Sequence, residues 1–400
     1  MVRRPVLAMF AVMAIVLGFV VVSTPAGAVI DDVVVVPSPN SAGNNYLSSV
    51  SCVSSSWCVA VGGFTGTEAL AELWNGDVWS VMPTPNATSN YELKSVSCVS
   101  TLSCVAVGTN SSGDVETLVE AWNGTEWSVV LSPNVVGSEN YLNSVSCVSV
   151  SSCVAVGRTS GGASNATLVE VWNGLEWLIA PSASPGSASL SSVSCLSMSD
   201  CVAVGVTNNG SAFVTLAEVW NGTDWSVMLI PSPGASDDAL TSVSCVSMSS
   251  CVAVGYTSNG SAYETLLESW NGLEWSVAPS PDAGAVDDEL YSVSCVSMSS
   301  CVAVGYTDTG PARVTLVEQW NGTVWSVMSS PSPGEDDALY SVSCVSAWDC
   351  IAVGSTFSAP DLKTLVLSLT GPVPPPTTTT TETPSTTSVS PDLVAPAFTG

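Results

Sequence analysis

The sequence has 400 residues, of which 46% are hydrophobic and only 10% are charged, and its 34 acidic and six basic side chains give a net charge of −28. A surface this acidic repels the phosphates of nucleic acids and the headgroups of anionic membranes, so neither partner is expected. Histidine is absent from the whole sequence, which excludes Ser-His-Asp and Cys-His catalytic arrangements, histidine general bases and histidine-ligated zinc or copper.

Residues 1–28 are predicted to be a secretory signal peptide. Arg3 and Arg4 precede an uncharged apolar run over residues 6–22, and the small residues that end at Ala28 are typical of a cleavage site. The apolar run is also long enough for an uncleaved membrane anchor, which remains an alternative. Cleavage would leave 34 acidic residues against four basic ones, a net charge of −30; the four are Lys94, Arg158, Arg313 and Lys363. We therefore expect an exported protein, secreted or at the cell surface.

Residues 29–371 consist of one sequence unit that occurs seven times. Each unit reads approximately Leu-x-Ser-Val-Ser-Cys-x5-Cys-Val-Ala-Val-Gly, a variable loop, Thr-Leu-x-Glu-x-Trp-Asn-Gly-x-x-Trp-Ser-Val and Pro-Ser-Pro. Four β-rich segments separated by turn residues, one turn being Asn-Gly, predict four antiparallel strands per unit. Four strands in roughly 40 to 50 residues is the period of a propeller blade. The sequence therefore predicts an all-β fold, a seven-bladed β-propeller.

Each unit contains one Cys-x5-Cys pair, and we expect each pair to form a local disulfide. The two cysteines flank a short loop between neighbouring strands, where cross-strand side chains come within bonding reach. Metal binding is disfavoured because Cys-x2-Cys spacing and histidine are both missing. Closing such a short loop stabilises the fold by about 2 kcal/mol per bond. The pairs are Cys52 and Cys58, Cys98 and Cys104, Cys147 and Cys153, Cys195 and Cys201, Cys245 and Cys251, Cys295 and Cys301, and Cys344 and Cys350.

The seventh unit lacks its fourth strand, and the amino-terminal end of the repeat region supplies a replacement. The Trp-Asn-Gly-x-x-Trp hairpin occurs in six units, whereas the seventh runs from Thr364 to Gly371 and then enters Pro-rich sequence. Residues 33–36, followed by Pro-Ser-Pro, match the fourth strand of the other units. We predict that they complete the seventh blade and close the ring, which leaves no unpaired end blade and favours a monomer. Residues 372–400, rich in proline and threonine, are predicted to form a disordered tail and are candidates for O-glycosylation or surface attachment.

A glutamate precedes the first tryptophan of each hairpin by two residues, so the two side chains lie on one face of the strand. The tryptophans are expected to pack between blades, each burying roughly 150 to 250 Å². In the alternative interpretation, one indole per blade stays exposed as a platform for a sugar and the glutamate accepts hydrogen bonds from hydroxyl groups. Leu367 replaces the glutamate in the seventh unit, so six sites at most are expected. The candidate ligand-binding residues are Glu72, Trp74, Glu120, Trp122, Glu170, Trp172, Glu218, Trp220, Glu268, Trp270, Glu318 and Trp320.

Acidic residues also gather in the loops that join consecutive units. Carboxylate oxygens in such loops are ligands suited to Ca²⁺, the one cofactor for which we find candidates. The alternative is a solvated acidic loop, because no Asp-x-Asp-x-Asp-Gly ligand series occurs. The weak Ca²⁺ candidates are Asp237, Asp238, Asp287, Asp288, Asp336 and Asp337.

Several of these features resemble known propellers. The Trp-Asn-Gly-x-x-Trp hairpin is similar to the turn of Asp-box propellers, and the seven-unit plan resembles kelch-like and galactose-oxidase-like propellers. Sialidases of the Asp-box type need three arginines, whereas only Arg158 and Arg313 remain here, and the oxidase needs histidines. The repeat also resembles exported actinobacterial proteins with Ser-Cys-x5-Cys and Trp-Asn-Gly signatures. These resemblances imply an extracellular propeller and no particular activity.

The units are nearly identical, whereas an active site requires one blade to differ from the others. The main departures include no recognisable acid–base pair or nucleophile, so we assign no catalytic residue and expect a non-enzymatic scaffold that binds a glycan or an extracellular protein. One alternative is a multivalent lectin that uses the glutamates and tryptophans. Another is a glycan hydrolase or lyase with two carboxylates roughly 5 to 10 Å apart in the central channel. The departures are Trp57, Arg158, Tyr256, Tyr291, Tyr306, Arg313, Tyr340 and Trp348.

Overall fold

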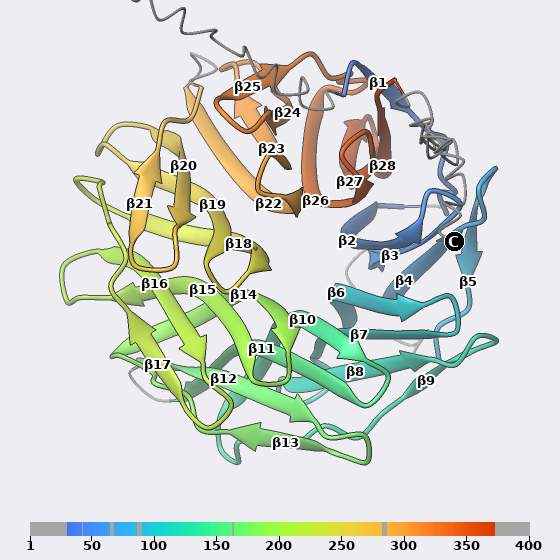
Figure 1. The fold of residues 1–400 in the computed structure, drawn as a ribbon. Helices are drawn as coiled ribbons and strands as arrows, with labels where there is room; N and C mark the ends of the chain where they lie inside the picture. Colours follow the sequence, from blue (N-terminus) through green and yellow to red (C-terminus); the bar gives the residue numbers. More distant parts are fainter. Residues whose placement is uncertain are drawn as a thin grey trace, which may run out of the picture.

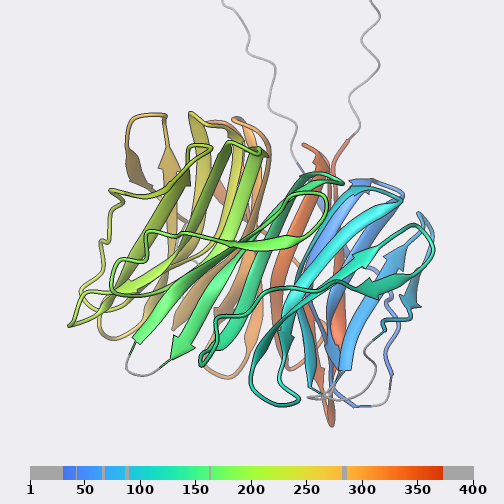
Figure 2. The ribbon, with the colours of Figure 1, turned by 90° about the horizontal axis from the view of Figure 1, so that it is seen from below.

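The computed structural model describes residues 30–372, except residues 42, 65–67, 86–89, 162–163 and 282–285. Twenty-eight strands and no helix occur in this part of the chain, and the strands form seven four-stranded antiparallel sheets around a central axis (Figure 1). The predicted seven-bladed propeller is therefore confirmed. Seen from the side, the strands run between the two faces of the ring (Figure 2). Within the described part of the chain there is no apolar helix of sufficient length to span a membrane. The predicted signal peptide and residues 373–400 of the predicted tail lie outside the described residues.

Each of blades 1 to 6 takes its four strands from one sequence unit, with the first strand nearest the axis (Figure 1). Blades 1 and 2 consist of β2 (Asn45–Ser54), β3 (Trp57–Phe64), β4 (Glu68–Trp74) and β5 (Trp79–Met82), and of β6 (Tyr91–Ser100), β7 (Ser103–Asn110), β8 (Glu116–Trp122) and β9 (Trp127–Val129). Blades 3 and 4 consist of β10 (Glu139–Ser149), β11 (Ser152–Gly161), β12 (Ser164–Trp172) and β13 (Trp177–Ala180), and of β14 (Ser187–Ser197), β15 (Asp200–Asn208), β16 (Phe213–Trp220) and β17 (Trp225–Met228). Blades 5 and 6 consist of β18 (Asp238–Ser247), β19 (Ser250–Ser258), β20 (Tyr263–Trp270) and β21 (Trp275–Ala278), and of β22 (Asp287–Ser297), β23 (Ser300–Asp308), β24 (Arg313–Trp320) and β25 (Trp325–Met328).

Blade 7 combines the two ends of the described chain. Its first three strands are β26 (Asp336–Ser346), β27 (Asp349–Ser358) and β28 (Asp361–Thr370), and its outer strand is β1 (Asp32–Val35). Val33 pairs with Leu369 and Val35 with Leu367 in antiparallel register. The prediction that the amino-terminal strand closes the ring is confirmed.

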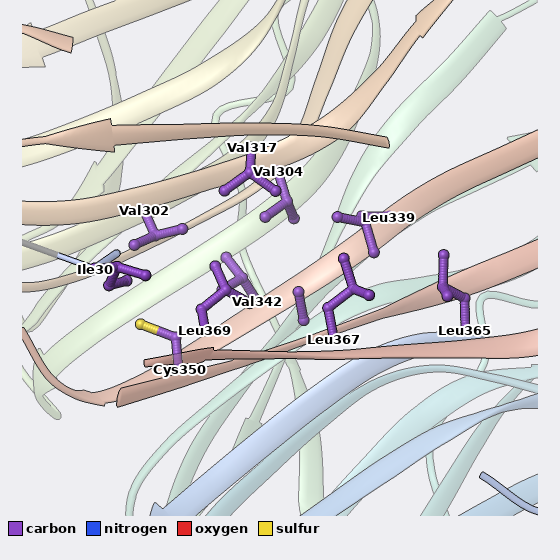
Figure 3. Packing of buried hydrophobic residues seen from close by; sticks show 11 residues of the cluster. Ile30, Val302, Val304, Val317, Leu339, Val342, Cys350, Leu365, Leu367 and Leu369 are labelled. Atoms are coloured by element: carbon purple, nitrogen blue, oxygen red, sulfur yellow. The ribbon is translucent and has the colours of Figure 1, made fainter. Parts of the chain in front are cut away.

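Apolar side chains from adjacent blades meet in seven clusters, one at each interface. At the interface of blades 6 and 7, Val302 and Val317 of blade 6 pack against Leu339 and Leu367 of blade 7 (Figure 3). A leucine five residues before the first cysteine of each unit is fully buried in all seven blades. These residues are Leu47, Leu93, Leu142, Leu190, Leu240, Leu290 and Leu339.

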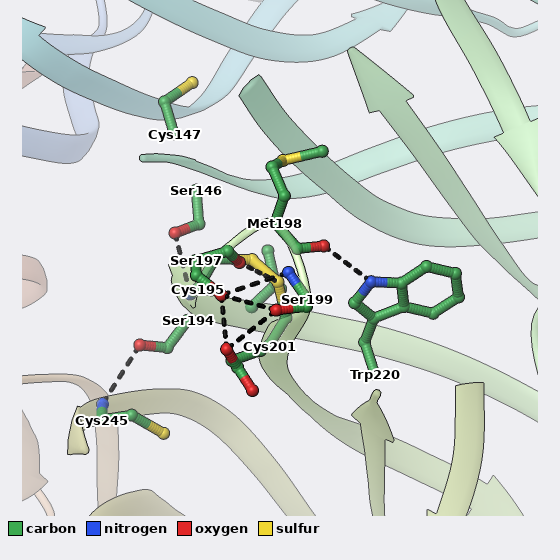
Figure 4. The surroundings of a disulfide bond; sticks show 12 residues. Ser146, Cys147, Ser194, Cys195, Ser197, Met198, Ser199, Cys201, Trp220 and Cys245 are labelled. Carbon is green, nitrogen blue, oxygen red and sulfur yellow. Dashed lines mark hydrogen bonds between the residues drawn. A yellow bond between two sulfur atoms is a disulfide. The ribbon is translucent and has the colours of Figure 1, made fainter. Parts of the chain in front are cut away.

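All seven predicted disulfides are present, one per blade, and no free cysteine occurs among the described residues. Figure 4 shows the surroundings of one of them, between Cys195 and Cys201. Each bond joins the first two strands of its blade at directly paired positions, such as Cys195 and Cys201. Seven disulfides in one domain indicate that the protein folds in an oxidising compartment.

A second set of links joins neighbouring blades near the axis. The two serines of each Ser-Val-Ser-Cys segment accept hydrogen bonds from backbone N–H groups of the next blade. Ser194 Oγ, for example, accepts from the N–H of Cys245 at 3.1 Å (Figure 4). Ser192 Oγ accepts from the N–H of Val243 at 3.2 Å. The inner strand is the edge of its sheet, so these N–H groups have no ladder partner of their own. The repeated serines therefore satisfy an exposed sheet edge.

Candidate functional site

Apart from Trp57 and Trp348 of the disulfide loops and Arg313 of β24, the residues that depart from the repeat gather at one end of the central channel, which we call the channel mouth. They occupy three positions of the unit: six and four residues before the first cysteine, and five residues after the second. The first and third of these positions pair across the first two strands, as Tyr141 does with Arg158. Two of the positions lie near the beginning of the first strand and the third lies beside them on the second strand, so all three are at the end of the blade away from the disulfide. The aromatic and charged residues at these positions are Tyr46, Glu92, Lys94, Tyr141, Arg158, Tyr256, Glu289, Tyr291, Tyr306 and Tyr340.

Blades 6 and 7 contribute a packed group of tyrosines to the mouth. The ring of Tyr291 lies 5.7 Å from the rings of both Tyr306 and Tyr340, centroid to centroid. The hydroxyl of Tyr306 donates to Glu289 at 2.9 Å. The guanidinium of Arg313 lies over the Tyr306 ring, 4.5 Å from its centroid. These contacts fill this side of the mouth.

Blades 1 to 3 bring charged groups to the other side. The Tyr46 hydroxyl donates to Glu92 at 3.1 Å, and burial is the main cause that raises the pKa of this tyrosine. Lys94 forms an ion pair with Glu92 at 3.8 Å and lies 5.9 Å from the centroid of the Tyr141 ring. Tyrosine rings and cations therefore alternate around this edge of the mouth.

Blade 4 has small side chains at these positions, and a pocket of about 570 Å³ opens there. Ser189 and Ser191 stand where blade 6 has Glu289 and Tyr291. Tyr141 of blade 3 and Tyr256 of blade 5 both line the recess. The other lining residues are Glu139, Asn143, Arg158, Ser160, Asn165, Val206, Ala239, Leu240 and Thr241.

Contacts among the lining residues hold Tyr141 and Arg158 in place. The guanidinium of Arg158 lies over the Tyr141 ring, 4.2 Å from its centroid. The Tyr141 hydroxyl donates to Glu139 at 2.8 Å, and this bond is the main cause that raises the tyrosine's pKa. On the opposite side, Tyr256 packs edge-on against Tyr263 with centroids 5.0 Å apart, and burial raises its pKa. The pocket thus combines aromatic faces, hydroxyl and amide groups, and a guanidinium.

The glutamates predicted to bind a ligand lie at the interfaces between blades. All six are fully buried. Glu72 and Glu170 each accept a hydrogen bond of 2.5 Å from a serine of the preceding blade, Ser38 and Ser132, and burial raises the pKa of both glutamates to about 7. Ser182 and Ser280 bond in the same way to Glu218 and Glu318.

Blade 4 breaks this pattern, because Ile230 stands where the other blades carry the interface hydroxyl. Neither carboxylate oxygen of Glu268, which lies across this interface, has a hydrogen-bond partner among the described residues. Burial raises the pKa of Glu268 to about 8, and nearby Asp238 adds to the rise. Its surroundings therefore favour the protonated form of this carboxyl group at neutral pH.

The tryptophans of the six hairpins divide into two classes. The first tryptophan of each hairpin is half-buried, and its indole N–H donates to a backbone carbonyl of the disulfide loop; Trp220 donates to Met198 at 2.8 Å (Figure 4). The second tryptophan is buried in the interface with the preceding blade, as Trp225 is. Sugar binding by the glutamates and first tryptophans stays a prediction, because nothing in the structure tests it.

The six aspartates proposed as Ca²⁺ candidates take different positions. Asp238 is buried and accepts bonds from Ser232 Oγ, the N–H of Gly234 and Thr257 Oγ1, whereas Asn45 and Asn140 cap the equivalent loops with uncharged amides. Among the residues described, no group of three or more Cys, Asp and Glu side chains could hold a metal ion. Asp288 and Asp337 are buried at the positions equivalent to Asp238. Asp237 accepts a hydrogen bond from the backbone N–H of Phe213, and Asp287 accepts one from that of Tyr263. Asp336 is exposed.

No family model and no curated protein matches the sequence. Solved structures are similar in fold. YCF48 bound to a D1 peptide superposes with a TM-score of 0.54 at 14% identity and covers 87% of this chain and 99% of its own. YCF48 from Cyanidioschyzon merolae gives 0.52 at 12% identity, covering 84% and 98%. A polysaccharide lyase of family PL25, an ulvan lyase bound to -[GlcA(1-4)Rha3S]-, gives 0.50 at 8% identity, covering 79% and 90%. At these identities the likeness shows the propeller fold alone.

Proposed function

We propose that this chain is an exported, non-enzymatic binding protein that takes a glycan into the channel-mouth pocket. The observation that carries the proposal is the recess at Ser189 and Ser191, lined by Tyr141 and Tyr256. The C–H face of a pyranose packs well on a tyrosine ring, and convergent polar groups in a concave site fix a ligand's orientation. Asn143, together with the serines, can meet the hydroxyl groups of a sugar.

The composition of the pocket supports binding rather than hydrolysis. Glycan hydrolysis by the usual route requires two carboxyl groups on either side of the scissile bond. Glu139 is the one acidic residue that lines the pocket, and its carboxylate already accepts the Tyr141 hydroxyl. The fully buried glutamates lie between blades and do not line the pocket. We therefore place the carboxylate-dependent hydrolase alternative below a binding role.

The proposal includes export and a monomeric scaffold. We propose that residues 1–28 direct secretion, that residues 372–400 form a tail, and that the protein acts in solution outside the cell or at its surface. Seven disulfides support this location. The closed ring of blades holds the residues of the pocket in fixed positions. The multivalent-lectin alternative has less support, because its glutamates are buried and its tryptophans are hydrogen-bonded to the disulfide loops.

The test is isothermal titration of the purified mature protein with a panel of neutral and acidic oligosaccharides. We expect saturable binding of at least one glycan, weakened tenfold or more by Tyr256→Ala. Phe213→Ala is the matched control, because Phe213 is an exposed aromatic residue of β16 outside the pocket lining. The proposal would be contradicted if no glycan bound, or if Tyr256→Ala and Phe213→Ala lowered the glycan affinity equally.

A further inference from the structure

We infer that the glycan recognised at the channel mouth is acidic and that Arg158 binds the carboxylate of a uronic acid residue; this inference rests on the proposed function. It follows from where the few basic residues lie, how Arg158 is held, and what else lines the pocket.

The basic residues of this strongly acidic chain are concentrated at the mouth. Among the described residues there are four, and Lys94, Arg158 and Arg313 all contact tyrosines of the mouth. The fourth, Lys363, lies on β28 outside the pocket lining. Elsewhere the surface repels anions, so this placement makes the mouth the most favourable site for an anionic ligand.

Neither arginine forms an ion pair with a carboxylate of the described residues. In a chain with 34 acidic side chains, a guanidinium would readily find an acidic neighbour. Yet the one ion pair among the residues described is between Lys94 and Glu92, and no carboxylate oxygen lies within 4.0 Å of the Arg158 or Arg313 guanidinium. The positive charge of Arg158 is therefore left for a ligand in the pocket that it lines.

The stacking of Arg158 on Tyr141 orients the guanidinium for this task. The two residues are direct cross-strand partners on β10 and β11, and the guanidinium lies 4.2 Å from the ring centroid. A guanidinium packed on an aromatic face keeps its donors in its own plane, where two of them match the two oxygens of a carboxylate. Less side-chain entropy is lost on binding because the group is already held.

The rest of the lining favours a sugar acid over an acidic peptide. Apolar contacts come only from Val206, Ala239 and Leu240 and from the two tyrosine rings, whereas most other lining residues carry hydroxyl or amide groups. Peptide ligands are usually anchored by apolar side chains in apolar pockets or by pairing with a sheet edge. A pyranose carboxylate instead needs one aromatic face, several polar partners and one guanidinium, all of which are present.

The experiment compares tetragalacturonate with its methyl ester by titration calorimetry on the mature protein, since the ester is the same sugar without charge. We expect the acid to bind at least tenfold more tightly than the ester. Arg158→Gln should remove this difference between acid and ester, and Arg158→Lys should retain part of it. Lys363→Gln is the matched control, because it removes the same charge outside the pocket. A hexaglutamate peptide serves as the non-sugar acid.

Equal binding of acid and ester, with both weakened by Tyr256→Ala, would overturn the acidic-glycan inference and leave the proposed function standing. Binding of hexaglutamate but of neither sugar, dependent on Arg158, would overturn it in favour of an acidic peptide. No binding of either sugar, here and across the oligosaccharide panel, would overturn the proposed function itself.

Discussion

The backbone N–H of Cys52 donates a hydrogen bond of 3.0 Å to the Oγ of Ser343, although the two residues are 291 positions apart in the sequence. This bond closes a ring of equivalent bonds that links every blade to the next, two at each interface. Each residue of the Ser-Val-Ser-Cys motif therefore has a role. The two serines accept hydrogen bonds from the next blade, the valine packs in the hydrophobic cluster between blades, and the cysteine forms the disulfide that joins the first two strands of its own blade. A rigid ring of this kind can hold the channel mouth in a fixed shape.

Loss of one interblade serine should destabilise the propeller. Ser242 Oγ accepts the N–H of Val293 at 3.2 Å in a buried setting. Ser242→Ala leaves that N–H without a partner, which costs about 1 to 3 kcal/mol. Urea unfolding followed by tryptophan fluorescence should show a lower midpoint than in wild type. The exposed Ser276→Ala serves as control, and equal midpoints for the two variants would show that the interblade bond contributes nothing.

Stability should decrease as the pH rises through neutrality. Burial raises the pKa of Glu72 and Glu170 to about 7 and of Glu268 and Glu318 to about 8, from an ordinary value of 4.5. The folded state therefore binds protons more tightly than the unfolded chain. The stabilisation is fully present below pH 4.5 and is lost as the pH rises through 7 to 8. Thermal melts at pH 5 and pH 8 in high salt, which screens general charge repulsion, should show the higher Tm at pH 5; an unchanged Tm would contradict this.

Glu268 differs from its counterparts, because Ile230 stands where the other blades carry a hydroxyl group and neither carboxylate oxygen has a hydrogen-bond partner among the described residues. Glu268→Gln removes the ionisation that burial opposes. At pH 8 we expect this variant to be more stable than wild type by up to about 5 kcal/mol, since the pKa of Glu268 is raised from 4.5 to about 8 and each unit corresponds to about 1.4 kcal/mol. At pH 5 the gain should disappear. Glu264→Gln, at an exposed position on the same strand, should have no effect at either pH, and a gain that does not depend on pH would refute the explanation.

Alanine at the hairpin glycine should be costly for a backbone reason. Gly222 has a φ of +94°, and a Cβ there would lie 3.0 Å from the Cβ of Ser199. Gly222→Ala should therefore destabilise the protein by about 1 to 2 kcal/mol. Gly113 has open space around its Cβ position and no positive φ, so Gly113→Ala is the control. Differential scanning calorimetry of both variants tests this prediction. Equal Tm values for Gly222→Ala and Gly113→Ala would show that the positive φ of Gly222 does not matter for stability.

The sequence was sufficient to predict the blades and their closure into a ring, and insufficient to predict which side chains from different blades meet at the channel mouth. The blade count, the disulfides and the strand formed by Val33 and its neighbours follow from periodic patterns. The expected packing of tryptophans between blades is found for the second tryptophan of each hairpin, but a single strand did not reveal that the glutamates are fully buried. Sequence reasoning missed Tyr46 and Tyr141 at the mouth. Comparing the seven units position by position would have found them, because both stand six residues before a first cysteine, at the position of Glu289.

Filling the recess should abolish glycan binding without harming the fold. Ser191 occupies the position at which blades 6 and 7 carry Tyr291 and Tyr340, so the repeat accommodates a tyrosine there. Ser191→Tyr should occupy the pocket and reduce glycan affinity at least tenfold, while the Tm stays within a few degrees of wild type. Ser48→Tyr makes the same change at the same position of blade 1, outside the pocket lining, and should bind as wild type does. If Ser191→Tyr binds glycan normally, the ligand does not enter this pocket. If both variants lose binding, the ligand covers the whole mouth instead of the blade 4 recess.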